Sequence, residues 1–92
     1  MNERTKVIAC SLKGAERAQR TERWHALGGY EVEQLHNGIR LVFANDVEHK
    51  LQELAVLERT CCAFADWDVR GNSIAITADD VTAVEAVRAL GF

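Results

Sequence analysis

The sequence predicts an α+β domain in which a mainly antiparallel sheet has helices packed on one face. Strand-like segments come in pairs joined by tight turns, and helix-forming segments separate the pairs. Hairpins give antiparallel neighbours, whereas parallel strands need long crossovers. The expected order over residues 1–92, taken as a single domain, is β-α-β-β-α-β-β-α, and a ferredoxin-like arrangement with extra elements is the favoured architecture.

A strand and a helix are expected first. The run VIACSL, residues 7–12, is rich in strand formers, and its alternation places Cys10 on the face that would meet the core. Helix formers then fill residues 13–27. Two glycines at 28–29 follow, which is where glycine commonly ends a helix.

Two hairpins are expected, one before and one after the second helix. Asn37–Gly38 lies between the strand-like runs 30–36 and 39–44, and Asn-Gly is the strongest short hairpin signal because both turn residues take positive φ. Further along, Gly71–Asn72 separates a run with Trp67 and Val69 from SIAITA.

The second and third helices have start signals of their own. Asn45 with Glu48 resembles a capping box, and the helix that they would start runs to about Cys62. Asp79 or Asp80 can cap the last helix, which would end near residues 89–90.

Charge and composition narrow the class of protein. A net charge of −3 gives no reason to expect nucleic acid, and no apolar run is long enough to span a membrane. The expected location is therefore the cytoplasm. An odd count of three cysteines argues against a disulfide framework, and adjacent Cα atoms are too close for an unstrained Cys61–Cys62 bond, so reduced thiols are expected.

Glu58 is the residue that most needs an explanation. At ~100° per residue it falls in the middle of the apolar stripe of the second helix, one turn before the two cysteines. A buried carboxylate needs a charged or hydrogen-bonding partner. The first helix offers Arg17 and Arg20 on the same line as Trp24, and Arg20 is the favoured partner.

The cysteines suggest a thiol site. Cys61 and Cys62 lie at a helix C-terminus near Glu58, where the helix dipole and the carboxylate disfavour a thiolate and hence a cysteine nucleophile. Metal coordination deprotonates thiols by itself, and three sulfurs, with Cys10, would suit a soft ion such as Cu(I), Zn(II), Hg(II) or As(III). Of the histidines, only His25 is expected near a core site.

Most of the chain, including a first strand that carries Cys10, resembles a family of small bacterial proteins whose C-terminal half has a motif of the form E-R-x-C-C-P-F followed by a strand. The matching residues are Glu58, Arg59, Cys61, Cys62, Phe64 and Trp67. Ala63 departs from the motif, because the family has proline there. The resemblance implies one α+β domain and a link to metal or metalloid stress. It does not imply any particular enzymatic reaction.

Three functions are compared. The leading hypothesis is a small binding or sensing protein in which Cys10, Cys61, Cys62 and Glu58 hold a soft metal or metalloid, with Arg20 and Trp67 in support. The first alternative is a structural or interaction module, acting as a homodimer or with a protein partner, in which the cysteines fill the core. The second is a cysteine-dependent enzyme, although no catalytic residue is assigned.

Overall fold

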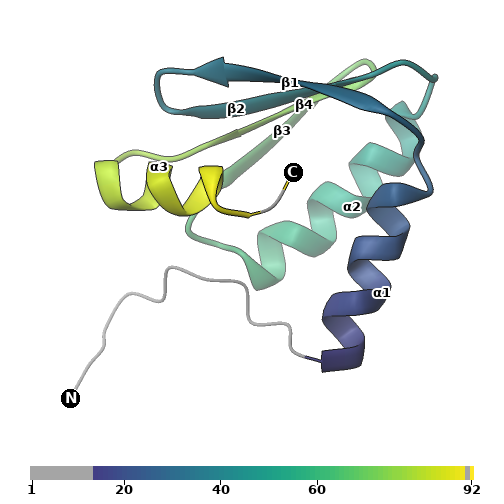
Figure 1. Ribbon diagram of the computed structural model, residues 1–92, viewed down its shortest axis with the longest axis horizontal. Coiled ribbons are helices and arrows are strands. Elements are labelled where there is room, and N and C mark those ends of the chain that lie inside the picture. The colour runs from purple at the N-terminus through teal and green to yellow at the C-terminus, as the bar shows by residue number, and fades with distance from the viewer. Residues whose placement is uncertain (1–13, 91) are drawn as a thin grey trace.

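The computed structural model describes residues 14–90 and residue 92, which form a four-stranded antiparallel sheet and three helices. The helices lie on one face of the sheet (Figure 1). The predicted class is therefore confirmed. The elements in chain order are α1 Gly14–His25, β1 Tyr30–Leu35, β2 Gly38–Phe43, α2 Glu48–Cys61, β3 Asp66–Arg70, β4 Ser73–Thr77 and α3 Val81–Arg88.

The described order begins with α1 instead of a strand. The strand expected at residues 7–12, with Cys10, lies outside the described residues. None of the helices in the described ranges is long and apolar enough to cross a membrane.

The sheet has the strand order β1-β2-β4-β3. Because β4 runs antiparallel to both of its neighbours, β2 and β3 run parallel with β4 between them. Together with α2, which connects them, they form a split β-α-β unit, the building block of ferredoxin-like sheets. The edge beside β2 is occupied by β1, the strand that precedes it in the chain.

The first hairpin turns one residue earlier than expected. Leu35 pairs with Gly38, so the two-residue loop is His36–Asn37 and Gly38 already belongs to β2. A side chain at Gly38 would collide with the Ile76 carbonyl oxygen on β4. The glycine therefore permits the close approach of two strands and is not a turn residue.

The expected capping box is absent from α2. Its N-cap residue is Val47, which makes no side-chain cap. Asn45 instead donates its amide Nδ2 to the Leu27 carbonyl at 3.3 Å, near the end of α1. Asn45 thus links the segment before α2 to the segment after α1. Asp80 caps α3 as expected, because its side chain accepts from the Ala83 amide at 2.8 Å.

The core lies between the sheet and the helices. Alternate residues of β2 and β4 point into it, and α2 covers β3 and β4 while α3 packs against β2 and β4. Its largest fully buried side chains are Phe43, Leu41, Leu51, Leu54, Ile74, Ile76, Val87 and Cys62. The split unit brings the C-terminal end of α2 and the start of β3 to the same edge of this core.

Gly38→Ala is expected to lower the free energy of unfolding by about 2–4 kcal/mol, because the added Cβ meets backbone atoms that cannot move independently. Gly29→Ala is the matched control, since nothing lies within 4 Å of its Cβ position, and it should be neutral or stabilise slightly. Urea denaturation measures both variants. Equal stability of the two would contradict the role assigned to Gly38.

Candidate functional site: a buried carboxylate beside two cysteines

Helix α2 directs the Glu58 side chain into the core. Leu51, Leu54 and Ala55 on the same helix are buried, and the Glu58 residue is only 4% exposed. It is the one buried charged residue in the part of the chain that the structure describes. The position that the helical stripe predicts for this carboxylate is therefore the observed one.

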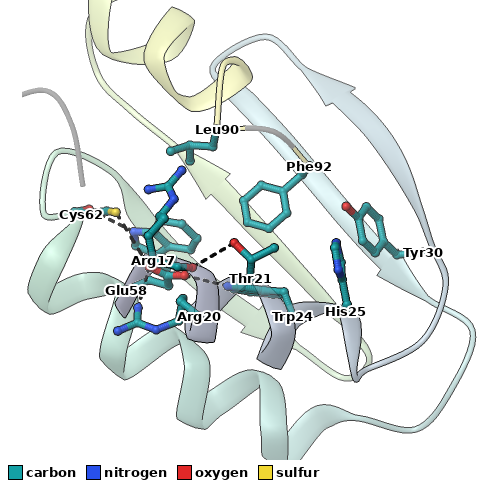
Figure 2. A pocket seen from close by; sticks show the side chains of 11 residues that line it. Arg17, Arg20, Thr21, Trp24, His25, Tyr30, Glu58, Cys62, Leu90 and Phe92 are labelled. Carbon is teal, nitrogen blue, oxygen red and sulfur yellow. Dashed lines mark hydrogen bonds and ion pairs between the residues drawn. The ribbon is translucent and has the colours of Figure 1, made fainter. Parts of the chain in front are cut away.

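Two donors from α1 bind this carboxylate. The Arg20 Nη1 donates to Glu58 Oε1 at 2.9 Å, and the Trp24 indole Nε1 donates to Oε2 at 2.7 Å (Figure 2). The ion pair expected between Arg20 and Glu58 is thus present. Each carboxylate oxygen has a donor, and the positive charge of Arg20 offsets the cost of burying the negative one.

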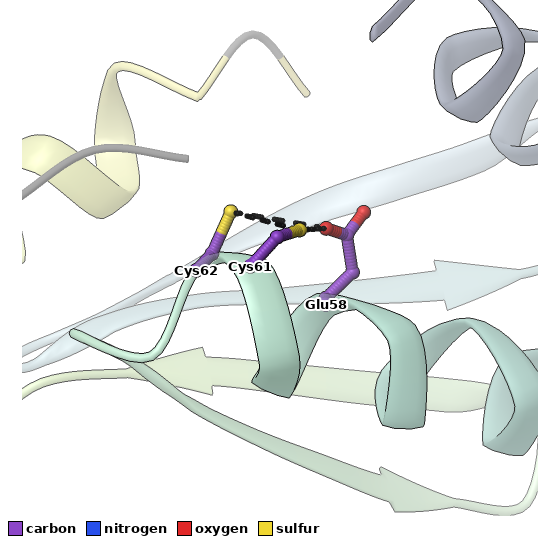
Figure 3. A group of neighbouring side chains, drawn as sticks. All are labelled: Glu58, Cys61 and Cys62. Carbon is purple, nitrogen blue, oxygen red and sulfur yellow. Dashed lines mark hydrogen bonds between the residues drawn. The ribbon is translucent and has the colours of Figure 1, made fainter. Parts of the chain in front are cut away.

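The sulfurs of Cys61 and Cys62 lie beside the same carboxylate oxygen. Cys61 Sγ is 3.4 Å and Cys62 Sγ 3.8 Å from Glu58 Oε1, and the two sulfurs are 3.9 Å apart. Figure 3 shows the three side chains converging at the end of α2. Their ligand atoms all lie within 4.8 Å of one another, which is close enough for a single metal ion.

The two cysteines differ in oxidation state. Cys61 is a thiol, whereas Cys62 is disulfide-bonded. The expectation of reduced thiols throughout is therefore wrong for Cys62, although the separation of 3.9 Å agrees with the prediction that the two neighbours do not bond to each other. The cluster can act as a pair of thiols only after reduction of Cys62.

The surroundings of Cys61 hold its proton. Burial raises the pKa of the Cys61 thiol, the Arg20 hydrogen bond at 3.4 Å lowers it, and the nearby Glu58 carboxylate raises it, with a raised pKa as the net result. A thiol of this kind is a weak nucleophile at neutral pH. This agrees with the sequence argument against a cysteine nucleophile.

Trp67 supports the cysteine pair through the backbone. At a helix C-terminus the last carbonyl oxygens have no partner within the helix. The Trp67 indole Nε1 donates to the Cys62 carbonyl at 3.2 Å, and the Arg59 guanidinium donates to the Trp67 carbonyl. This arrangement holds the end of α2 against β3 and thereby positions both sulfurs.

A cavity of about 70 Å³ opens beside the cluster. Figure 2 shows it between α1, the end of α2 and the C-terminal residues. His25, predicted as the histidine nearest a core site, lines it. The full lining is Arg17, Arg20, Thr21, Trp24, His25, Tyr30, Glu58, Cys62, Trp67, Leu90 and Phe92.

Several predicted and unpredicted residues meet here. Glu58, Cys61, Cys62 and Arg20 converge as the sequence suggests, while Cys10 lies outside the described residues. The Trp24 hydrogen bond was not anticipated, although its helical spacing from Arg20 was a signal that both side chains face α2. Phe92 had no sequence signal, because a single aromatic residue forms no pattern.

Fold and site together define a small α+β domain with a carboxylate–thiol cluster at one end of its core. No protein-family model matches this chain, and the comparisons with curated proteins and with solved structures give no match either.

Glu58→Gln is expected to lower the free energy of unfolding by about 2–4 kcal/mol, because Arg20, with a side chain only 15% exposed, keeps its charge and loses its partner. Glu53→Gln is the matched control on the same helix. Glu53 is 53% exposed and contacts Arg23 and His49 at the surface, so the change should stay within about 0.5 kcal/mol. Thermal and urea denaturation measure both, and equal effects would argue against the buried pair.

Alkylation of Cys61 by iodoacetamide is expected to rise with pH along a curve whose midpoint is above that of an unfolded control, because the folded protein raises the thiol pKa. The unfolded chain loses this proton first, so the contribution of Cys61 to stability falls as pH rises past the unfolded value. Peptide mapping by mass spectrometry reads the modified residue. A midpoint below that of the unfolded control would restore the case for a nucleophile.

Proposed function

We propose that the protein binds or senses a soft metal or metalloid ion through the thiolates of Cys61 and Cys62 in the reduced state. The observation that carries this proposal is the convergence of both sulfurs with Glu58 Oε1. Cys62 joins after a dithiol reductant opens its disulfide: the reductant becomes a cyclic disulfide, and the two released protein sulfurs take up its two protons. A reducing compartment such as the cytoplasm suits this requirement.

The sulfur separation supports a three- or four-coordinate ion. Two thiolates at the ~2.3 Å typical of zinc would lie about 3.8 Å apart in tetrahedral and about 4.0 Å apart in trigonal geometry, against ~4.6 Å in a linear complex. The observed 3.9 Å falls between the first two values. The pair therefore needs little rearrangement to chelate such an ion.

A third ligand has two candidates. When Cys61 loses its proton, its hydrogen bond to Glu58 Oε1 is lost. The lone pair that accepted this bond becomes available to the ion, while the oxygen still accepts from Arg20 Nη1. Cys10 is the third sulfur that we propose from the sequence, and with it the ligand set would be all thiolate. Arg20 balances negative charge in both arrangements.

The rival functions have less support. An enzyme with Cys61 as nucleophile is disfavoured by the raised pKa of that thiol. A structural or interaction module is favoured by the pairing of Glu58 with Arg20 and Trp24, which accounts for the carboxylate without any ligand. The molar mass of the protein in solution, measured by light scattering, would show whether it forms the homodimer that the structural-module hypothesis includes.

The reduced, desalted protein is expected to take up one equivalent of Zn(II) or Cu(I), measured by native mass spectrometry and thiolate-to-metal absorption. Uptake should strengthen as pH rises, because binding displaces the Cys61 proton that burial retains. Cys61→Ser and Cys62→Ser should each weaken binding at least tenfold. Hg(II) and As(III) titrations test the softer ions.

Matched variants separate the ligands. Glu53→Gln should leave uptake unchanged, whereas Glu58→Gln and Cys10→Ser report which residue supplies the third ligand. Failure of the reduced protein to bind any of the four ions, or unchanged uptake in both Cys61→Ser and Cys62→Ser, would overturn the proposal and favour the structural module.

A further inference from the structure

The charges at the cluster select for the charge of the ion. In the metal-free state the Arg20 and Glu58 charges cancel. Coordination removes the protons of Cys61 and Cys62, so the two thiolates then add two negative charges. A divalent ion restores neutrality, whereas a monovalent ion leaves one uncompensated negative charge beside Glu58, which is buried.

Other charges near the cluster do not change this balance. Arg17 and His25 line the neighbouring cavity, but both residues are exposed, so water and salt screen them. Arg59 is exposed as well, and its guanidinium donates to the Trp67 carbonyl. Among the described residues, Arg20, with a side chain 15% exposed, is therefore the cation that acts most strongly on a bound ion.

The ligand atoms suit a borderline divalent ion. Zn(II) accepts thiolate sulfur and carboxylate oxygen together, whereas Cu(I) prefers sulfur. With zinc bond lengths of ~2.3 Å to sulfur and ~2.1 Å to oxygen, tetrahedral geometry places the sulfur and the oxygen about 3.6 Å apart. The separations of 3.4 and 3.8 Å between Glu58 Oε1 and the two sulfurs lie on either side of this value.

The protein offers such an ion three ligand atoms. Glu58 Oε2 accepts from the Trp24 indole at 2.7 Å, so Oε1 is the carboxylate oxygen that faces the sulfurs. Zn(II) in proteins takes four ligands. Glu58 and Cys62 both line the cavity of about 70 Å³, which has room for a few water molecules (Figure 2). The fourth ligand can therefore come from solvent.

We infer that the cluster is a site for a four-coordinate divalent ion of the Zn(II) class, with Cys61, Cys62 and Glu58 as ligands and an exchangeable water molecule from the cavity in the fourth position. On binding, each thiol releases its proton to solvent, and the aqua ion keeps one water molecule and loses the others. This inference rests on the proposed function and narrows it, because it assigns the charge of the ion and excludes Cys10 as a ligand. An open fourth position is typical of zinc sites that bind or activate a small molecule.

Co(II) is the probe of coordination, because four-coordinate Co(II) absorbs visible light strongly and six-coordinate Co(II) weakly. The reduced protein with one equivalent of Co(II) should show strong visible bands and thiolate-to-cobalt absorption in the near ultraviolet. Azide should change the visible bands in saturable fashion as it replaces the water. Cys10→Ser should leave both results unchanged. Weak visible bands, a spectrum that azide does not alter, or loss of the bands in Cys10→Ser would overturn the inference.

Glu58→Gln tests the charge balance. With two thiolates and Arg20 remaining, a monovalent ion becomes the one that leaves the cluster neutral. The ratio of the Zn(II) to the Cu(I) association constant, measured by competition with chromophoric chelators, should fall about 100-fold or more, the effect of one unbalanced buried charge. Glu53→Gln, which removes an exposed carboxylate from the same helix, is the matched control and should leave the ratio unchanged. Circular dichroism in the presence of each ion confirms the fold.

The outcomes separate this inference from the proposed function. An unchanged ratio in Glu58→Gln, or six-coordinate Co(II) in the wild-type protein, would overturn the inference while ion uptake through the cysteines still stands. Absence of uptake of every ion would overturn both. The Co(II) spectrum needs no substitution, so it decides the question even where Glu58→Gln does not fold.

Discussion

The carboxylate of Glu58 is the constraint on which the arrangement of this protein depends. A buried negative charge is tolerated only where donors surround it. Here the donors are Arg20 and Trp24, and both come from α1, whose buried Trp24 ring also packs against Phe43 and Trp67. The position of α1 against α2 therefore satisfies the Glu58 carboxylate and buries the Trp24 ring at the same time.

The same interaction governs the chemistry of the neighbouring sulfurs. Arg20 Nη1 contacts both Glu58 Oε1 and Cys61 Sγ, so a change at any of the three groups alters the other two. Protonated, Cys61 donates toward the carboxylate; as a thiolate it would face the arginine. The two protonation states of Cys61 thus differ in charge and in the neighbour that the sulfur engages.

Local patterns predicted most of the fold and half of the site. The helices, both hairpins and the Glu58–Arg20 pair follow from spacing along single elements. Sequence patterns did not predict features that depend on distant segments. The turn of the first hairpin is displaced by one residue because Gly38 in β2 must approach Ile76 in β4 closely. Asn45 donates to the Leu27 carbonyl instead of capping α2. The disulfide state of Cys62 and the aromatic cavity likewise require knowledge of which segments meet in space.

The central position of β4 has a consequence for how the chain is made. β2 can pair with β1 as soon as residue 43 has emerged from the ribosome, but its other neighbour in the sheet is complete only at residue 77. At ~5–20 residues per second, one side of β2 waits about two to seven seconds for its partner. During that interval the strand is an open edge, and Arg40 with its ion pair to Glu33 is a charged residue that discourages pairing with another chain.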